Sequence, residues 1–151
     1  MKIRKGFVSN SSSSSFIVIG EGDLQFPDHE DQIFVIGGSG ETEFGWEVVK
    51  YKFMSDRINF AAIQAMYIDQ MNNNEEMMNR LINIIKECTK CKEVDCMLTL
   101  DYTDKTKDFA YIDHQSSAYS GRNIEMFDDD KSLINFLFAE DSYIQGDNDN
   151  Y

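Results

Sequence analysis

Apolar residues in the first part of this 151-residue chain come in short runs that are typical of β-strands. Residues 16–19 and 33–36 are each a run of four apolar side chains followed by glycine, so both are expected to be buried strands. Residues 44–54 alternate between two faces, with one slip of phase that a bulge would produce. The segment 33–54 therefore predicts a β-hairpin with a glycine-rich turn.

The spacing of apolar residues becomes helical from Asp56 onward. Either Ser55 or Asp56 can cap this helix. The stripe of this first helix consists of Ile58, Ala61, Ala62, Ala65 and Ile68. Asn72-Asn73-Asn74 interrupts the pattern, and a second helix follows it. The stripe of the second helix consists of Met78, Leu81, Ile82, Ile85 and Cys88. Two helices joined by so short a turn are expected to pack antiparallel.

Strand spacing returns at residues 96–102 and again at 109–114, with a polar turn between them, which predicts a second hairpin. A last helix follows, with an aspartate at its start and five apolar positions: Leu133, Ile134, Phe136, Leu137 and Phe138. Because strands and helices come in blocks, the fold class is expected to be α+β. We expect a mostly antiparallel sheet from the two hairpins and an N-terminal strand, with the helical hairpin and the C-terminal helix packed on it.

The length favours one domain, which we place at residues 16–145. Residues 1–15 form a basic, serine-rich segment, and residues 146–151 form an acidic polar tail. The serine run consists of Ser11, Ser12, Ser13, Ser14 and Ser15. Two interpretations of it stay open: a flexible arm, or an extended segment that continues into the first strand.

The net charge of −13 limits the partners that this chain can bind. Such a surface repels phosphates, so direct contact with nucleic acid or with an anionic membrane is not expected, whereas basic protein surfaces are attracted. Solubility alone is the plainer reason for the acidity. The candidate binding residues come from two acidic clusters: Glu21 and Asp23, and Asp128, Asp129 and Asp130. No apolar run approaches the length of a membrane helix, and we expect a cytoplasmic protein.

Candidate catalytic chemistry is concentrated in Asp113-His114-Gln115-Ser116, at the end of a predicted strand. A serine nucleophile with His114 as base and Asp113 as the orienting acid would be a hydrolase-like arrangement. No G-x-S-x-G motif surrounds a serine here. A polar strand end that is hydrogen-bonded to the following loop explains the same residues.

The three cysteines offer an alternative of a different kind, because Cys88-x-x-Cys91 has the spacing of zinc ligands and Cys96 could join them. Cys88 continues the stripe of a helix and Cys96 begins the stripe of a strand, so both also fit core positions. We expect no metal and no cofactor.

The opening of the chain carries a resemblance. After a short basic start, residues 6–16 read GFVSNSSSSSF, and this string resembles a segment that opens many otherwise different, uncharacterised proteins of tailed bacteriophages. The likeness covers residues 1–18. It implies a phage-encoded accessory protein acting in the infected cell, and it implies no activity and no catalytic residue. A shared opening on different bodies suggests a handle for recognition, modification or processing.

The sequence thus predicts a small acidic accessory protein of a phage that is non-catalytic and binds a host or phage protein. In one version it is a nucleic-acid mimic whose carboxylates occupy a basic site on that partner. The alternatives are a small hydrolase-like enzyme centred on Asp113 and His114, and a virion or assembly component.

Overall fold

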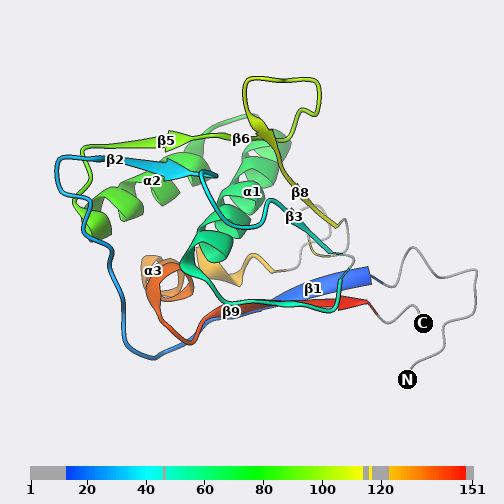
Figure 1. Cartoon of the computed structure of the whole chain (residues 1–151), viewed down its shortest axis with the longest axis horizontal. Coiled ribbons are helices and arrows are strands. Elements are labelled where there is room, and N and C mark those ends of the chain that lie inside the picture. Colours follow the sequence, from blue (N-terminus) through cyan, green and yellow to red (C-terminus); the bar gives the residue numbers. More distant parts are fainter. Residues whose placement is uncertain (1–12, 46, 114–115, 117–122, 149–151) are drawn as a thin grey trace, which may run out of the picture.

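Three α-helices and nine short strands make up the part of the chain that the computed structural model describes, which is residues 13–45, 47–113, 116 and 123–148 (Figure 1). The helices are α1 (Met54–Asn72), α2 (Glu76–Thr89) and α3 (Asp130–Phe138), and a 3₁₀ turn, η3 (Glu125–Phe127), precedes α3. The α+β fold class is confirmed, as are the three expected helices.

The first and last strands of the described chain pair with each other. β1 (Ser13–Val18) and β9 (Tyr143–Asn148) are antiparallel, and β4 (Lys50–Tyr51) lies on the other side of β9 (Figure 1). β1 begins within the serine run, so its last three serines are strand residues, while Ser11 and Ser12 lie outside the described residues. β9 includes residues 146–148 of the segment described above as a polar tail, and residues 149–151 lie outside the described residues.

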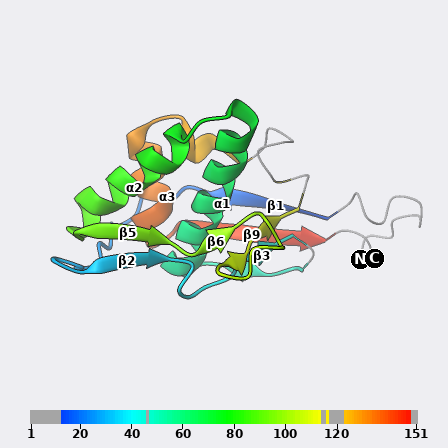
Figure 2. The same ribbon diagram turned by 90° about the horizontal axis from the view of Figure 1, so that it is seen from above.

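The remaining strands form parallel pairs, and this corrects both predicted hairpins. β2 (Ile33–Ile36) pairs with β5 (Glu93–Cys96), β3 (Glu43–Phe44) pairs with β8 (Tyr111–Ile112), and β6 (Leu98–Thr99) pairs with β7 (Asp108–Phe109). A tight turn cannot join two parallel neighbours, and the connection between β2 and β5 includes α1 and α2. Alternation along a strand shows which face is buried but not which strand is its neighbour. Figure 2 shows α2 and α3 on the same side of the β2–β5 pair.

Helix α1 is the centre of the core, and it contacts α2, α3, β2 and β8. Side chains around its whole circumference are buried, so its polar residues must find partners inside the protein. Phe60 stacks edge-on against Phe44 and Phe136, with ring centres 5.2 and 6.2 Å apart. These rings connect α1 to β3 on one side and to α3 on the other.

Carboxylates satisfy the free amides at the starts of two helices. The Asp129 carboxylate accepts from the Ser132 amide at 2.7 Å, which confirms the predicted aspartate cap of α3. The Asp69 carboxylate, near the end of α1, accepts from the amides of Met77 and Met78 at 2.9 and 3.0 Å. Asp69 therefore fixes the start of α2 against the end of α1.

The buried guanidinium of Arg57 joins the start of α1 to the end of α3. Its Nε and Nη2 atoms donate to the carbonyls of Phe136 and Leu137 at 2.9 Å, and Nη1 donates to the Lys52 carbonyl at 2.6 Å. Carbonyls at the end of a helix lack partners within the helix and carry the negative end of its dipole, so a cation is stabilising there. Burial lowers the pKa of Arg57 below its ordinary value.

Candidate functional site

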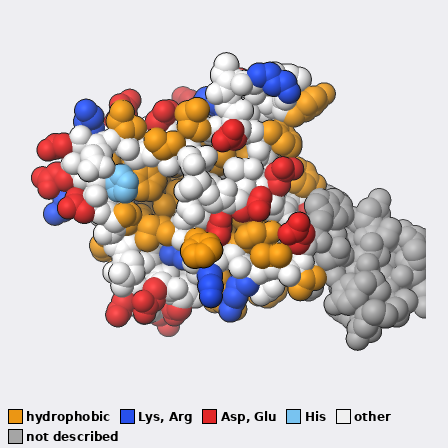
Figure 3. Space-filling model, viewed as in Figure 1, with side chains coloured by type: hydrophobic (Ala, Val, Ile, Leu, Met, Phe, Trp, Pro, Cys, Tyr) orange, Lys and Arg blue, Asp and Glu red, His pale blue; other side chains and the backbone are white. Residues whose placement is uncertain are grey.

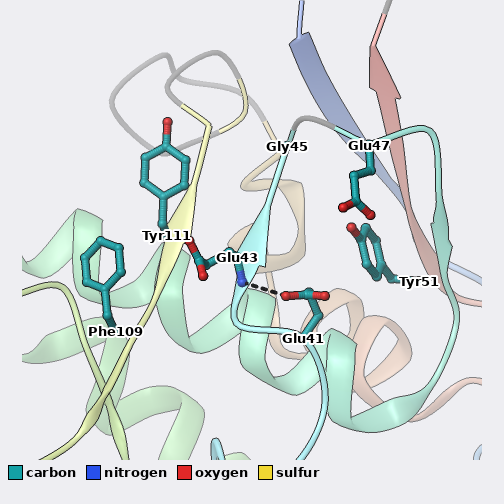
Figure 4. Close-up of a pocket in the computed structure, with 7 residues that line it drawn as sticks. All are labelled: Glu41, Glu43, Gly45, Glu47, Tyr51, Phe109 and Tyr111. Carbon is teal, nitrogen blue, oxygen red and sulfur yellow. Dashed lines mark hydrogen bonds between the residues drawn. The ribbon is translucent and has the colours of Figure 1, made fainter. Parts of the chain in front are cut away.

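An open cavity of about 530 Å³ lies between β3, β4, β7 and β8 (Figure 4). We call it the acidic pocket. Its lining combines three carboxylates with three aromatic rings and one glycine: Glu41, Glu43, Glu47, Tyr51, Phe109, Tyr111 and Gly45. Acidic side chains are visible in the region of β3 and β8 on the face shown in Figure 3.

The start of α1 holds the loop that carries Glu41. The Asp56 carboxylate accepts from the Glu41 amide at 2.7 Å, and the Asn59 side-chain amide donates to the Glu41 carbonyl at 2.9 Å. Oε1 of Glu41 accepts from the amides of Thr42 and Glu43, both at 3.1 Å. The other carboxylate oxygen points away from these amides, toward the side of Tyr51 (Figure 4). The two backbone amides that follow Glu41 thus hold its carboxylate in place.

The parallel pairing of β3 with β8 brings Glu43 beside Tyr111. The Tyr111 amide donates to the Thr42 carbonyl at 2.9 Å, and Phe109, two residues before Tyr111, faces the same side (Figure 4). Gly45 ends β3 with φ of 151°, and a Cβ atom there would lie 2.7 Å from Cβ of Asp113. Only glycine fits this close approach, and it lets the chain turn from β3 toward Glu47.

Tyr51 forms the inner wall of the pocket and is 8% exposed. Its ring packs edge-on against Phe44, with ring centres 5.0 Å apart. Its hydroxyl points toward the Glu47 carboxylate in Figure 4 but makes no hydrogen bond with any described residue. Burial, followed by the charges of Glu41, Glu47 and Asp56, raises the pKa of Tyr51 to about 12. The hydroxyl therefore stays protonated and neutral at physiological pH.

No described Lys or Arg residue lines the acidic pocket. The ion pair found within the described ranges joins Arg80 to Asp130 instead. Lys50, next to Tyr51 on β4, lies 4.1 Å from the centre of the Tyr143 ring. Among the residues that the structure describes, no three His, Cys, Asp or Glu side chains are grouped as metal ligands would be. The pocket therefore suits a cation that brings its own hydrogen-bond donors.

Asp113 and Ser116, the candidate catalytic residues, lie in a second, buried cluster with Ser15. The Ser15 hydroxyl donates to the Asp113 carboxylate at 3.2 Å, and Oγ of Ser116 accepts from the Ser15 amide. The Ser116 hydroxyl lies 2.9 Å from the Ser15 carbonyl and 3.2 Å from the Asp113 carboxylate. Asn123 also donates to the Ser15 carbonyl. The serine run is thus linked to the strand end that carries the candidate acid.

The side chains of Asp113 and Ser116 are buried, and this bears on whether they can be catalytic. Asp113 is 1% exposed and Ser116 is fully buried, so a substrate does not reach either side chain in this conformation. Ser116 supplies partners for the buried backbone amide and carbonyl of Ser15, and Asp113 accepts from the Ser15 hydroxyl. The geometry supports the interpretation of a hydrogen-bonded strand end. His114 lies outside the described residues.

The acidic residues singled out from the sequence do not line the acidic pocket. Asp128, Asp129 and Asp130 are exposed at the start of α3, where Asp129 caps the helix and Asp130 pairs with Arg80 at 2.9 Å. Glu21 and Asp23 are exposed near Asp141, whose carboxylate accepts from the Gly22 amide at 2.9 Å. Sequence reasoning missed the three pocket glutamates, although their spacing around Phe44-Gly45 in ETEFGWE is a visible signal.

The cysteines are free thiols in partly or fully buried positions. Burial raises the pKa of Cys88 and of Cys96, so neither thiol is activated as a thiolate. Cys91 is buried at the end of the loop that follows α2, and its amide donates to the Thr89 hydroxyl at 3.3 Å. These surroundings fit the core positions expected from the sequence.

Comparison of the chain with family models, with curated proteins and with solved structures gives no match. None of the helices in the described part of the chain combines the length and apolarity needed to cross a membrane. The functional assignment therefore depends on the geometry of the acidic pocket and of the buried cluster of Ser15, Asp113 and Ser116.

Replacing Ser116 by alanine should lower the free energy of unfolding by about 2 kcal/mol, because the buried Ser15 amide loses its acceptor. Ser39→Ala is the matched control, since that side chain is exposed, and its effect should stay within about 0.5 kcal/mol. Urea unfolding measures both values. Equal stability of Ser116→Ala and the wild type would show that the cluster does not hold β1 in place.

Tyr51 should make the stability of the protein depend on alkaline pH. An unfolded tyrosine has a pKa of about 10, whereas the folded value is raised to about 12. Between these values the unfolded chain has released the proton and the folded chain keeps it, so stability falls as the pH rises. Tyr51→Phe lacks this contribution, and its stability should fall less steeply over the same range. Urea unfolding at several pH values compares the two slopes, and parallel slopes would contradict the raised pKa.

Proposed function

We propose that this protein is a non-catalytic, phage-encoded accessory protein that binds a basic protein of the host or the phage. The observation that supports it most directly is the acidic pocket, where three glutamates line an open cavity and no Lys or Arg of the described chain lines it with them. Uncompensated charges at a cavity destabilise the free protein by mutual repulsion, and a cationic partner relieves that repulsion. In this proposal the acidic pocket is the point where the basic partner makes its specific contact.

The rest of the surface adds long-range electrostatic attraction of a basic partner. The chain has 27 acidic and 14 basic residues, and the five acids expected from the sequence to bind are all exposed. Charges of one sign accelerate the approach of an oppositely charged partner, and salt weakens this effect. In this proposal Glu21, Asp23 and the three aspartates before α3 attract the partner, while the acidic pocket makes the specific contact.

The phage assignment is supported by the resemblance of residues 6–16 to the opening segment of tailed-bacteriophage proteins. In this proposal the protein acts in the cytoplasm of the infected cell. If the basic partner is itself a nucleic-acid-binding protein, the carboxylates would act as a mimic of phosphates, and DNA would compete for the same partner.

The hydrolase-like alternative receives less support from the geometry. Asp113 and Ser116 are buried, and they bind the side-chain hydroxyl and the backbone amide of Ser15, respectively. A nucleophile has to reach its substrate, and the Ser116 hydroxyl is enclosed in this conformation. We therefore assign the cluster a role in holding β1 against β8.

Three substitutions in the acidic pocket should abolish binding of the basic partner. The test uses immobilised wild type, a variant with Glu41, Glu43 and Glu47 all changed to Gln, and a control with Glu75, Glu87 and Glu140 changed to Gln. Both variants lose the same charge, and the control positions are exposed acids outside the pocket. Host lysate is applied at low salt, and proteins eluted by a salt gradient are identified by mass spectrometry.

We expect a basic protein that the wild type and the control retain and the pocket variant loses, with elution at moderate salt. Equal loss from both variants would show that net charge alone attracts the protein. Retention that does not depend on salt, or no retained protein, would contradict the proposed function.

A further inference from the structure

We propose that the acidic pocket is a binding site for an arginine side chain, with the glutamates around the guanidinium and the aromatic rings against its flat faces. This inference rests on the proposed function and names the chemical group by which the partner is recognised. It follows from the kinds of atoms that line the cavity and from the directions in which they point.

The polar side-chain groups of the pocket residues are three carboxylates and the hydroxyls of Tyr51 and Tyr111. Glu41, Glu43 and Glu47 contribute carboxylate oxygens, and the Tyr51 hydroxyl has no partner among the described residues although the side chain is 8% exposed. The hydroxyl oxygen borders the open cavity, so a ligand or solvent can bond to it there. A guanidinium has five N–H donors and no acceptor, so it matches a ring of oxygen atoms.

The apolar walls of the pocket favour a flat cation. Phe109 and Tyr111 project on the same side of β7 and β8, and the Phe109 ring is 38% exposed (Figure 4). Guanidinium groups stack on aromatic faces and are more weakly hydrated than ammonium groups, so they lose less on leaving water. Arginine can therefore stack on the rings and donate hydrogen bonds to the carboxylates at the same time. Lysine has no flat group that stacks in this way.

The charge of the cavity disfavours anionic ligands, and its size accommodates an arginine side chain. The three glutamates repel phosphate and carboxylate ligands, and the described residues contain no grouping that would hold a metal ion. The volume of about 530 Å³ is within the usual range of ligand pockets and leaves room for more than one side chain. The arginine of a protein partner would enter together with its neighbouring residues.

The test measures binding of three blocked tripeptides by NMR, using the backbone amide signals of ¹⁵N-labelled protein. The probes are acetyl-Gly-Arg-Gly-amide, the same peptide with lysine, and the same peptide with citrulline, which has the shape of arginine without its charge. We expect the arginine peptide to shift the amide signals of Glu43, Gly45 and Tyr111. The lysine peptide should bind several-fold more weakly, and the citrulline peptide at least 10-fold more weakly.

Variants locate the site. Glu41, Glu43 and Glu47 changed together to Gln should weaken binding of the arginine peptide at least 10-fold, whereas the Glu75, Glu87 and Glu140 control should bind as the wild type does. Tyr51→Phe should weaken it several-fold without changing the far-ultraviolet circular dichroism spectrum. Equal binding of the citrulline or lysine peptide, or shifts confined to residues outside the pocket, would overturn the inference.

The two proposals fail in different ways. If no arginine peptide binds but a basic protein is still retained through the three glutamates, the arginine assignment is wrong and the proposed function stands. If the peptide binds in the pocket but no basic protein is retained, the site stands and the proposed function is wrong.

Discussion

The buried hydrogen bonds around Asp113 are the interaction on which the arrangement of the two sheets depends. Ser15 lies in the antiparallel sheet of β1, β9 and β4, and Asp113 directly follows β8 in the small parallel sheet with β3. The side chains of Ser15, Asp113 and Ser116 connect these sheets through atoms that no solvent reaches. Since buried polar groups without partners are costly, this cluster allows the sheets few other positions relative to each other.

The acidic pocket is a consequence of that arrangement, because its walls come from both sheets. Tyr51 belongs to β4, while Glu43 and Tyr111 belong to the β3–β8 pair, and Gly45 permits the close approach of β3 to Asp113. The Glu41 carboxylate accepts from the amides of Thr42 and Glu43, and the Glu41 amide donates to Asp56 at the start of α1. In the arginine proposal, this fixed carboxylate beside the neutral Tyr51 hydroxyl lowers the cost of ordering the site when the cation binds.

The sequence allowed the α+β class, the three helices and the aspartate cap of α3 to be predicted, since each depends on local spacing or on a local hydrogen bond. The strand partners could not be predicted in the same way. β2 has the buried alternation of Phe34 and Ile36, but its partner β5 lies beyond two helices. The candidate site shows the same limit: Asp113 and Ser116 were visible as neighbours in the chain, whereas their contact with Ser15 spans about a hundred residues. The pocket glutamates come together with Tyr51 only when β3 and β4 take their places in the fold.

The most direct test of this account is an intermolecular nuclear Overhauser measurement between a ¹³C-labelled arginine tripeptide and the protein. The account predicts contacts from the arginine side-chain methylene protons to the ring protons of Tyr51, Phe109 and Tyr111. Contacts only to rings outside the acidic pocket, or saturating binding without contact to any of these three rings, would contradict it.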